Sequence, residues 1–338
     1  MPRLLATLAL AFTLWDCQAQ SLDAATRARV VERTIAEIRD SYVDPSAAIK
    51  VHAAFRDGRA GLDGVTDGEA FAKQLTGLMQ SVVPDRHLHV EYSAEPLLQA
   101  VAPTVSELAL RRALDEKANY GVERVERLPG NIGYIDLRSF SKTDWAAQTL
   151  AACMTVVAHT DALIIDLRRN GGGYPATVTL VESYLFDKRT HVVDVVWREG
   201  QRTEQFWTQD SVPGLRFGGS KPVWLLTSKA TFSGAEQFAY DLKNLKRATV
   251  VGETTGGGAN PGKFVTLDEH FGLVVPTGRA VSPITHGNWE GVGVEPDVPV
   301  EAEKAFHVAH RLALSSLIAS ASKGVQRQSL QDILDTLR

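Results

Sequence analysis

Residues 222–239 read PVWLLTSKATFSGAEQFA, an apolar run followed by a short turn and an amphipathic segment. This order predicts a buried strand that turns into a helix, with Ser233 at the first turn of that helix. Backbone N–H groups at this position lack intrahelical partners, so they can stabilise negative charge on a bound carbonyl. Ser233 also suits an N-cap, since Glu236 has the capping-box spacing. The segment alone allows a nucleophile, a cap or both.

Strand and helix patterns alternate from Asn131 onward, which favours an α/β layer architecture. Residues 131–140 and 162–167 read as strands, and residues 144–159 and 176–185 as helices. Further strands are expected at 192–197, 203–208 and 248–251, with a hairpin formed by 264–267 and 273–276. The chain thus predicts a sheet covered by helices.

The first part of the chain has a different pattern. Residues 22–83 favour a small helical bundle, with segments near 45–59 and 67–82. A short strand at 90–92 and a helix at 105–118 follow, and the domain boundary is expected within 95–103. We therefore expect a helical bundle over residues 20–100 and an α/β catalytic domain over 101–338.

The N-terminus predicts an export signal. Arg3 precedes an apolar stretch at 4–15, and Cys17-Gln18-Ala19 supplies the small residues of a cleavage site, so we expect cleavage after Ala19. The apolar stretch is too short to span a bilayer as a helix, and lipid attachment at Cys17 is the second interpretation. The expected location of the mature chain is the periplasm or the exterior, without an integral membrane segment.

Composition excludes several partner classes. The formal net charge is −4 and there is no basic run, so neither nucleic acid nor an anionic membrane surface is implied. After cleavage the chain keeps a single cysteine, Cys153, in an apolar helical pattern. We interpret it as a buried small hydrophobe, so the fold must rest on its core rather than on disulfides.

A glycine-rich segment, DLRRNGGG at 166–173, follows one of the predicted strands. Its glycines can present backbone N–H groups to a ligand at the carboxyl end of that strand. A phosphate loop does not fit, because no Lys-Ser or Lys-Thr follows the glycines. We expect Asp166 and Arg168 to form a structural pair that fixes this loop.

Four segments in this order carry a resemblance to a known family: IIDLRRNGGG, LLTSKATFSGAEQFA, VVGETTGGG and WEGVGVEPDV. Together they resemble the carboxyl-terminal processing (tail-specific) serine peptidases, over about residues 22–300. The segment ANYGVERVERLPGNIGYIDL is similar to the branch that contains interphotoreceptor retinoid-binding protein repeats and the tricorn protease core. The resemblance implies a crotonase/ClpP-like α/β core after a helical bundle, and the spacing leaves no room for a PDZ domain.

The resemblance implies a role for individual residues. Ser233 matches the nucleophile, and the N–H groups of Gly234 and Gly172 match the oxyanion donors, with Gly171 the alternative to Gly172. Many family members carry a lysine base about 25 residues after the serine, but this chain has Gly258 there.

Without that lysine, His87 matches the general base of the tricorn-like branch, and Glu290 matches its acidic residue. Arg86 stands where tricorn protease has a serine. His89, His286 and Lys263 remain open as alternative bases.

Two further acidic residues have structural interpretations. Glu253 could hold the glycine segment in place, and Asp297 is expected to form a turn or a cap.

The sequence thus predicts an exported serine peptidase that hydrolyses peptide bonds through an acyl-enzyme, with no metal or organic cofactor and with a peptide or protein as substrate. The alternative is a carrier of apolar ligands such as fatty acids or retinoids, which would keep the fold without needing catalysis. The oligomeric state is not predicted.

Overall fold

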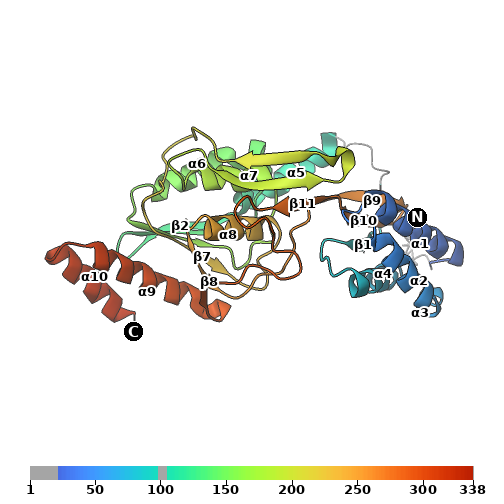
Figure 1. Ribbon diagram of the computed structural model, residues 1–338. Helices are drawn as coiled ribbons and strands as arrows, with labels where there is room; N and C mark the ends of the chain where they lie inside the picture. Colours follow the sequence, from blue (N-terminus) through green and yellow to red (C-terminus); the bar gives the residue numbers. More distant parts are fainter. Residues whose placement is uncertain (1–21, 98–104, 338) are drawn as a thin grey trace, which may run out of the picture.

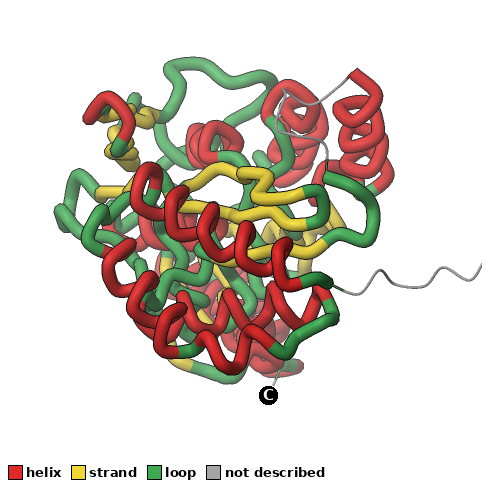
Figure 2. Tube along the Cα trace, turned by 90° about the vertical axis from the view of Figure 1, so that its right-hand side faces the viewer, coloured by secondary structure: helices red, strands yellow, loops and turns green. Residues whose placement is uncertain are grey.

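The computed structural model describes residues 22–97 and 105–337, and it has two lobes (Figure 1). The predicted cleavage after Ala19 and the lipid site at Cys17 lie outside the described residues. A tube view turned by 90° brings the smaller lobe to the front, with its helices beside its strands (Figure 2). The predicted α/β core preceded by a helical bundle is confirmed.

The larger lobe is built on a six-stranded sheet in the order β12-β8-β7-β4-β3-β2. Its strands are β2 (Val122–Leu128), β3 (Ile132–Leu137), β4 (Ala162–Asp166), β7 (Val223–Thr227), β8 (Thr249–Gly252) and β12 (Val298–Pro299). All neighbouring pairs are parallel except β2 with β3. The carboxyl ends of the parallel strands therefore meet at one edge, where loops can build a site.

Helices cover both faces of this sheet. Side chains such as Leu163 and Ile165 pack with α6 (Thr143–Val157), α7 (Pro175–Ser183) and α8 (Gly234–Asn244). The alternate residues Ala162 and Ile164 face α9 (Ala302–Ser320) and α10 (Val325–Thr336). Burial on both faces explains why the parallel strands are continuous apolar runs in the sequence. Cys153 lies in the first of these cores, as predicted, and burial raises the pKa of its thiol to about 12.

A second sheet, β11-β5-β6, extends the first core. It comprises β5 (His191–Trp197), β6 (Thr203–Trp207) and β11 (Gly278–Val281), with the short helix η2 (Glu199–Gln201) between β5 and β6. The helix α5 (Val105–Lys117) and the short helix η1 (Asn119–Gly121) precede β2.

The smaller lobe contains α1 (Ala24–Ser41), α2 (Ala47–Asp57), α3 (Arg59–Asp63), α4 (Gly68–Val82) and β1 (His89–Tyr92). It also contains the hairpin of β9 (Gly262–Asp268) and β10 (Phe271–Pro276), whose second strand pairs with β1. Figure 1 shows this orange hairpin among the blue helices. The expected division near residue 100 assigned the hairpin to the α/β unit, whereas its apolar side chains complete the core of the helical lobe.

The hairpin makes the chain cross between the lobes three times, and hydrogen bonds join the lobes at the crossing. Val43 donates its N–H to the carbonyl of Pro276 (2.9 Å), and the guanidinium of Arg198 donates to the carbonyls of Arg39 and Tyr42. These contacts fix the smaller lobe beside the carboxyl edge of the sheet.

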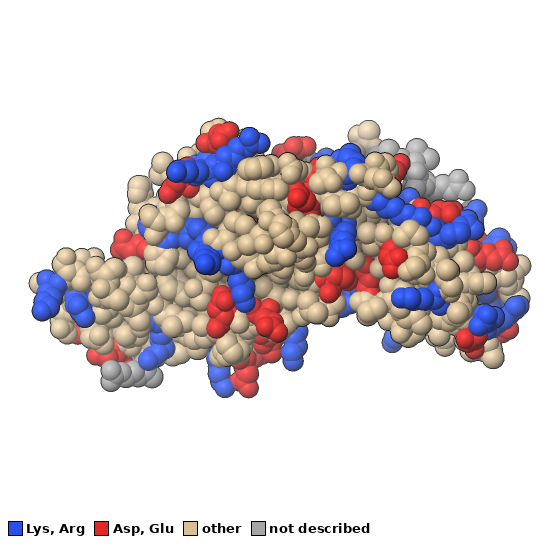
Figure 3. Space-filling view, in the orientation of Figure 1, with Lys and Arg blue, Asp and Glu red and all other residues tan. Residues whose placement is uncertain are grey.

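On the face drawn in Figure 3, acidic and basic side chains are interspersed. Within residues 22–97 and 105–337, no helix has the length and apolar character needed to cross a bilayer.

Candidate active site

Ser233 lies between β7 and α8, as the sequence predicts. Its backbone has φ 56° and ψ −122°, a conformation that residues other than glycine rarely adopt. Gly172 passes close beneath it, because a Cβ there would lie 2.7 Å from both the Cβ of Ser233 and the nitrogen of Gly234. The turn is therefore a strained, closely packed junction, as is common at functional sites.

Glu236 holds this turn in place. Its fully buried carboxylate accepts the N–H of Ser233 (2.8 Å) and the N–H groups of Gly257 (2.6 Å) and Gly258 (2.8 Å). The hydroxyl of Thr255 donates to it as well (2.5 Å). The capping-box spacing thus has a second use that the sequence did not predict, because Glu236 joins the serine turn to the 256–258 glycine segment.

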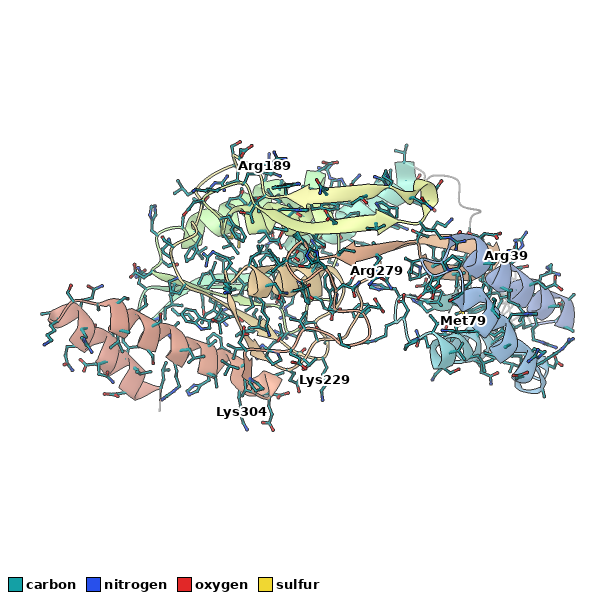
Figure 4. The ribbon with its side chains drawn as sticks, viewed as in Figure 1. Arg39, Met79, Arg189, Lys229, Arg279 and Lys304 are labelled. Atoms are coloured by element: carbon teal, nitrogen blue, oxygen red, sulfur yellow. The ribbon has the colours of Figure 1, made fainter. Side chains whose placement is uncertain are left out.

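Glu253 was expected to hold the glycine segment at 166–173 in place. Its carboxylate instead accepts the N–H of Lys229 (3.4 Å) and lies 3.9 Å from the ammonium of the same residue, whose side chain is exposed (Figure 4). The expected structural pair is present, since Asp166 pairs with the guanidinium of Arg168 (2.5 Å). Asp297 was expected to form a turn or a cap, but its carboxylate instead accepts the N–H of Val250 (2.8 Å) and pairs with Lys243 (3.3 Å).

A cavity of about 320 Å³ adjoins the serine turn. Ser233 and His87 both line it, although they come from different lobes and are distant in sequence. The ring of His87 packs on the ring of Phe232, with 4.6 Å between centroids. The guanidinium of Arg86 lies over the same ring (4.8 Å) and donates to the carbonyl of Gly256 (3.0 Å). Packing on Phe232 therefore docks the histidine segment against the serine turn.

This packing explains the glycine that replaces the lysine. A Cβ on Gly258 would lie 2.3 Å from the Phe232 ring and 2.8 Å from Cε1 of His87. Any side chain at this position would displace one of the two rings. His87 and a lysine at position 258 are therefore mutually exclusive in this arrangement.

Two carboxyl groups lie beside the ring of His87. Asp85 Oδ1 is 4.0 Å from Nδ1 and accepts the backbone N–H of His87 (2.9 Å). Its Oδ2 accepts from the hydroxyl of Tyr42 and from the amide of Asn260, both at 3.0 Å. Both lobes therefore fix Asp85, a residue that the sequence analysis did not single out.

Glu290 is the second carboxyl group, at the place that the sequence predicts. One oxygen accepts the N–H of Ala259 (2.6 Å), while Oε1 is buried without a partner among the described residues, as is Nδ1 of His87. Burial, reinforced by the negative charge of Asp85, raises the pKa of Glu290 to about 7. Burial lowers the pKa of His87, so the imidazole is neutral and able to accept a proton.

The alternative bases lie elsewhere. His89 hydrogen-bonds through Nδ1 to the carbonyl of His87 and through Nε2 to Glu91, both at 2.9 Å, so both its nitrogens are engaged. His286 and Lys263 are exposed side chains. Of the four candidate bases, His87 is the one that lines the cavity with Ser233.

The glycine loop changes the predicted oxyanion donors. The N–H of Gly172 donates to Oδ1 of Asn170 (2.8 Å), so that N–H is already engaged. Gly171 is exposed, with open space around it. Gly173 and Gly234 line the cavity beside Ser233. The geometry therefore favours Gly173 over Gly172 as the partner of Gly234.

Residues 131–300 match the sequence model of peptidase family S41, which covers half of the chain. The chain belongs to peptidase family S41. The matched range contains Ser233, Gly173, Gly234 and Glu290 but not His87, which the smaller lobe supplies.

Curated relatives are 25–28% identical to the chain over the aligned residues. The carboxyl-terminal-processing peptidase 2 of Arabidopsis thaliana, a chloroplastic protein, is 28% identical over 76% of this chain and 50% of its own length. The carboxy-terminal processing protease CtpB of Bacillus subtilis is 25% identical over 52% of this chain and 35% of its own. The chain thus spans half or less of the length of these relatives.

Solved structures show the same fold. A structure from Parabacteroides merdae has a TM-score of 0.60 at 18% identity and covers 88% of this chain and 99% of its own. A lipoprotein from Streptococcus agalactiae has a TM-score of 0.55 at 14% identity, covering 86% and 96%. Because these structures cover 86–88% of the chain, the shared fold extends beyond residues 131–300.

The residues around His87 could also hold a metal ion. Asp85, His87 and Glu290 offer ligand atoms within 4.8 Å of one another, the one such group of His, Cys, Asp and Glu found among the described residues. Histidine with two carboxylates is a ligand set that suits zinc. The same three residues also fit an arrangement without a metal, in which two acidic residues orient the ring of the histidine.

Proposed function

We propose that the protein is an exported serine peptidase that hydrolyses peptide bonds through an acyl-enzyme on Ser233. The observation that carries the proposal is the shared cavity, which brings a strained serine and a neutral, buried histidine together from two lobes. Membership in family S41 supports the reaction class. Its processing-peptidase relatives and the apolar N-terminal stretch support export and a peptide substrate.

The mechanism follows from the positions of these groups. His87 accepts the hydroxyl proton as Ser233 attacks the scissile carbonyl carbon, and it then donates that proton to the leaving amine. The N–H groups of Gly234 and Gly173 donate to the oxyanion, a contribution worth about 2.7–4 kcal/mol for one donor in a comparable site. Water, activated by His87, then hydrolyses the ester and regenerates Ser233.

Asp85 and Glu290 have separate tasks in this proposal. Asp85 receives three hydrogen bonds that fix it facing Nδ1 of His87, so it orients the ring and stabilises the imidazolium. Glu290 retains its proton up to about pH 7 and is held by Ala259, so it supplies a hydrogen-bond donor beside Asp85 and His87.

The test compares two serines that precede helices. Ser233→Ala should abolish cleavage of an unstructured peptide library while leaving the thermal unfolding curve near that of wild type. Ser46→Ala, at the exposed N-cap of α2, is the matched control and should cleave like wild type. Unchanged cleavage by Ser233→Ala would remove Ser233 from the mechanism.

A carrier of fatty acids or retinoid-like ligands is the second candidate, because the cavity wall is mainly apolar. Val195, Val274, Ala280 and Trp289 line it. Titration with a fluorescent fatty acid separates the functions. A carrier binds it at the cavity and leaves the peptide library intact, whereas a peptidase cleaves the library.

A further inference from the structure

The inner faces of α7 and α8 carry two carboxyl groups that the proposed mechanism does not use. Glu182 of α7 is 0% exposed and Asp241 of α8 is 1% exposed. None of their four carboxyl oxygens has a hydrogen-bond partner among the described residues. Buried acids of this kind are costly unless they are neutral or paired.

No cation compensates them. Within the described residues, Asp241 is the charged group that acts on Glu182, and Glu182 is the one that acts on Asp241. The nearby guanidinium groups bind main-chain carbonyls instead. Arg216 donates to the carbonyls of Ser183 and Phe186, and Arg247 donates to that of Leu185.

The α7 and α8 helices pack in one core, and the two carboxyl groups interact with each other across that interface. Two facing carboxylates in an apolar core cannot both be charged, whereas a carboxylic acid donates one strong hydrogen bond to its carboxylate neighbour. Burial raises the pKa of Glu182 to about 8 and that of Asp241 well above its usual range. The neighbouring polar groups are uncharged: Gln237 lies beside Asp241, and Thr179 is one turn before Glu182.

Both helices begin at the cavity. Gly173 lies two residues before the start of α7 and Gly234 is the first residue of α8, so the two proposed oxyanion donors lie at the starts of these helices. The start of α8 touches the segment that leads into α7, since a Cβ on Gly234 would lie 3.0 Å from the carbonyl oxygen of Gly173. A change in the spacing of the helices would therefore change the oxyanion site.

We propose that Glu182 and Asp241 share one proton in the native state and act as positioning residues, holding α7 against α8 and so fixing the distance between Gly173 and Gly234. Loss of the shared proton to solvent leaves two negative charges in the interface, which repel and separate the helices. The inference that the pair positions the two oxyanion donors rests on the proposed function. The inference that the pair shares a proton does not.

The shared proton predicts a slope of stability against pH. Both acids are ionised in the unfolded chain above about pH 4.5, while the folded chain keeps one proton until about pH 8. The folded state thus binds more protons, and the folding equilibrium constant falls about tenfold per pH unit across this window because of the pair. Stability is greatest at the acidic end of the window and is lost as pH rises.

The first experiment measures urea unfolding of the full chain from pH 5 to pH 8. Glu182→Gln and Asp241→Asn keep a hydrogen-bond donor without a titrating proton, so each should lower the slope by about one proton. Glu116→Gln, on the exposed face of α5, is the matched control and should keep the wild-type slope. If the slope of stability against pH is unchanged in both Glu182→Gln and Asp241→Asn, the proposal of a shared proton is overturned.

If neither variant folds, infrared spectroscopy of a folded protein decides the point. Glu290 also has a raised pKa, so the measurement uses Glu290→Gln at pH 7 to remove its signal. The C=O band of a protonated carboxyl group should remain in that variant and disappear above about pH 9. Absence of the band at pH 7 would overturn the proposal.

The second experiment tests positioning through the rate at which a fluorophosphonate probe labels Ser233. In wild type the rate should fall at least tenfold as pH rises above 8, and Glu182→Gln should remove that fall. Glu182→Gln could lose the slope of stability against pH and still show the wild-type fall in labelling rate above pH 8. That result would overturn the proposal that the pair positions Gly173 and Gly234. If wild type is not labelled at any pH, the proposed function fails, while the unfolding slopes still decide the shared proton.

Discussion

The two halves of the candidate active site are held in different ways. In the larger lobe, Glu236 hydrogen-bonds the backbone of Ser233 to the glycine segment, so the nucleophile is fixed through the main chain. In the smaller lobe, the ring of His87 rests on Phe232 and its Nδ1 has no partner among the described residues. Hydrogen bonds thus fix the backbone of Ser233. The position of His87 depends instead on packing and on the two acidic residues beside it.

This difference locates the sensitive part of the site. Changes to the acids behind His87 should alter catalysis without unfolding the protein, whereas changes to the packing of Phe232 should uncouple the lobes. The predictions below separate these effects.

The largest effect is expected at Asp85. Asp85→Asn keeps the size of the side chain but removes the charge that stabilises the imidazolium, and the corresponding change in a well-studied triad costs about 10⁴ in kcat. We expect a loss in kcat of about 10³–10⁴ with little change in KM, measured on a peptide substrate. Glu91→Gln, beside His89, is the control and should keep wild-type kcat. A loss confined to KM would show that Asp85 binds substrate instead.

The packing on Phe232 is tested at Gly258. Gly258→Ala places a Cβ against Phe232 and His87, so it should lower the rate of Ser233 labelling about 10²-fold. Gly171→Ala is the control, because that glycine has open space around it, and it should change the rate less than threefold. Gly258→Lys with activity equal to wild type would show that the lysine dyad can form here and that His87 is dispensable.

Glu290 should give a proton-linked effect on stability. Its pKa is raised in the folded state, so the folded chain holds a proton that the unfolded chain releases near pH 4.5. Its contribution is fully present below that pH and is lost as pH rises to about 7. Glu290→Gln should therefore flatten the fall in the urea midpoint between pH 4.5 and 7. A steeper fall in the variant than in wild type would reverse the assigned sign.

The smallest effect is expected at Arg86. Arg86→Ala removes the guanidinium from the face of Phe232 and a hydrogen bond to Gly256, a loss of about 0.5–1 kcal/mol of stability for an exposed contact. Arg86→Lys should recover part of it, which chemical denaturation can measure. Equal losses in both variants would assign the contact to the guanidinium geometry alone.

Local pattern in the sequence predicted much of the fold, because helix and strand periodicities are short-range properties. The serine turn, the alternation from Asn131 onward and the helical bundle all follow from it. It could not predict that β9 and β10 cross back to pair with β1, since strand pairing between distant segments leaves no local signal. The expected boundary near residue 100 therefore separated strands that share a core.

Residues of the candidate site that belong to sequence motifs were predictable. Residues whose role depends on a contact in the folded protein were not. Ser233, His87 and Glu290 come from ordered motifs, and the structure brings all three to one place. Asp85 and the loop-holding role of Glu236 emerge from hydrogen bonds between distant segments. Gly173 emerges from its place in the cavity wall and from the local bond that engages the N–H of Gly172. The spacing of Asp85 two residues before His87 is the signal that could have identified it.

The central claim is that one active site is assembled from both lobes. Mass spectrometry after exposure to a fluorophosphonate probe tests it directly, using wild type, His87→Ala and the control His89→Ala. The proposal predicts rapid labelling of Ser233 in wild type and His89→Ala, and a rate lowered about 10⁴-fold or more in His87→Ala. Labelling of Ser233 in His87→Ala at the wild-type rate would contradict the claim.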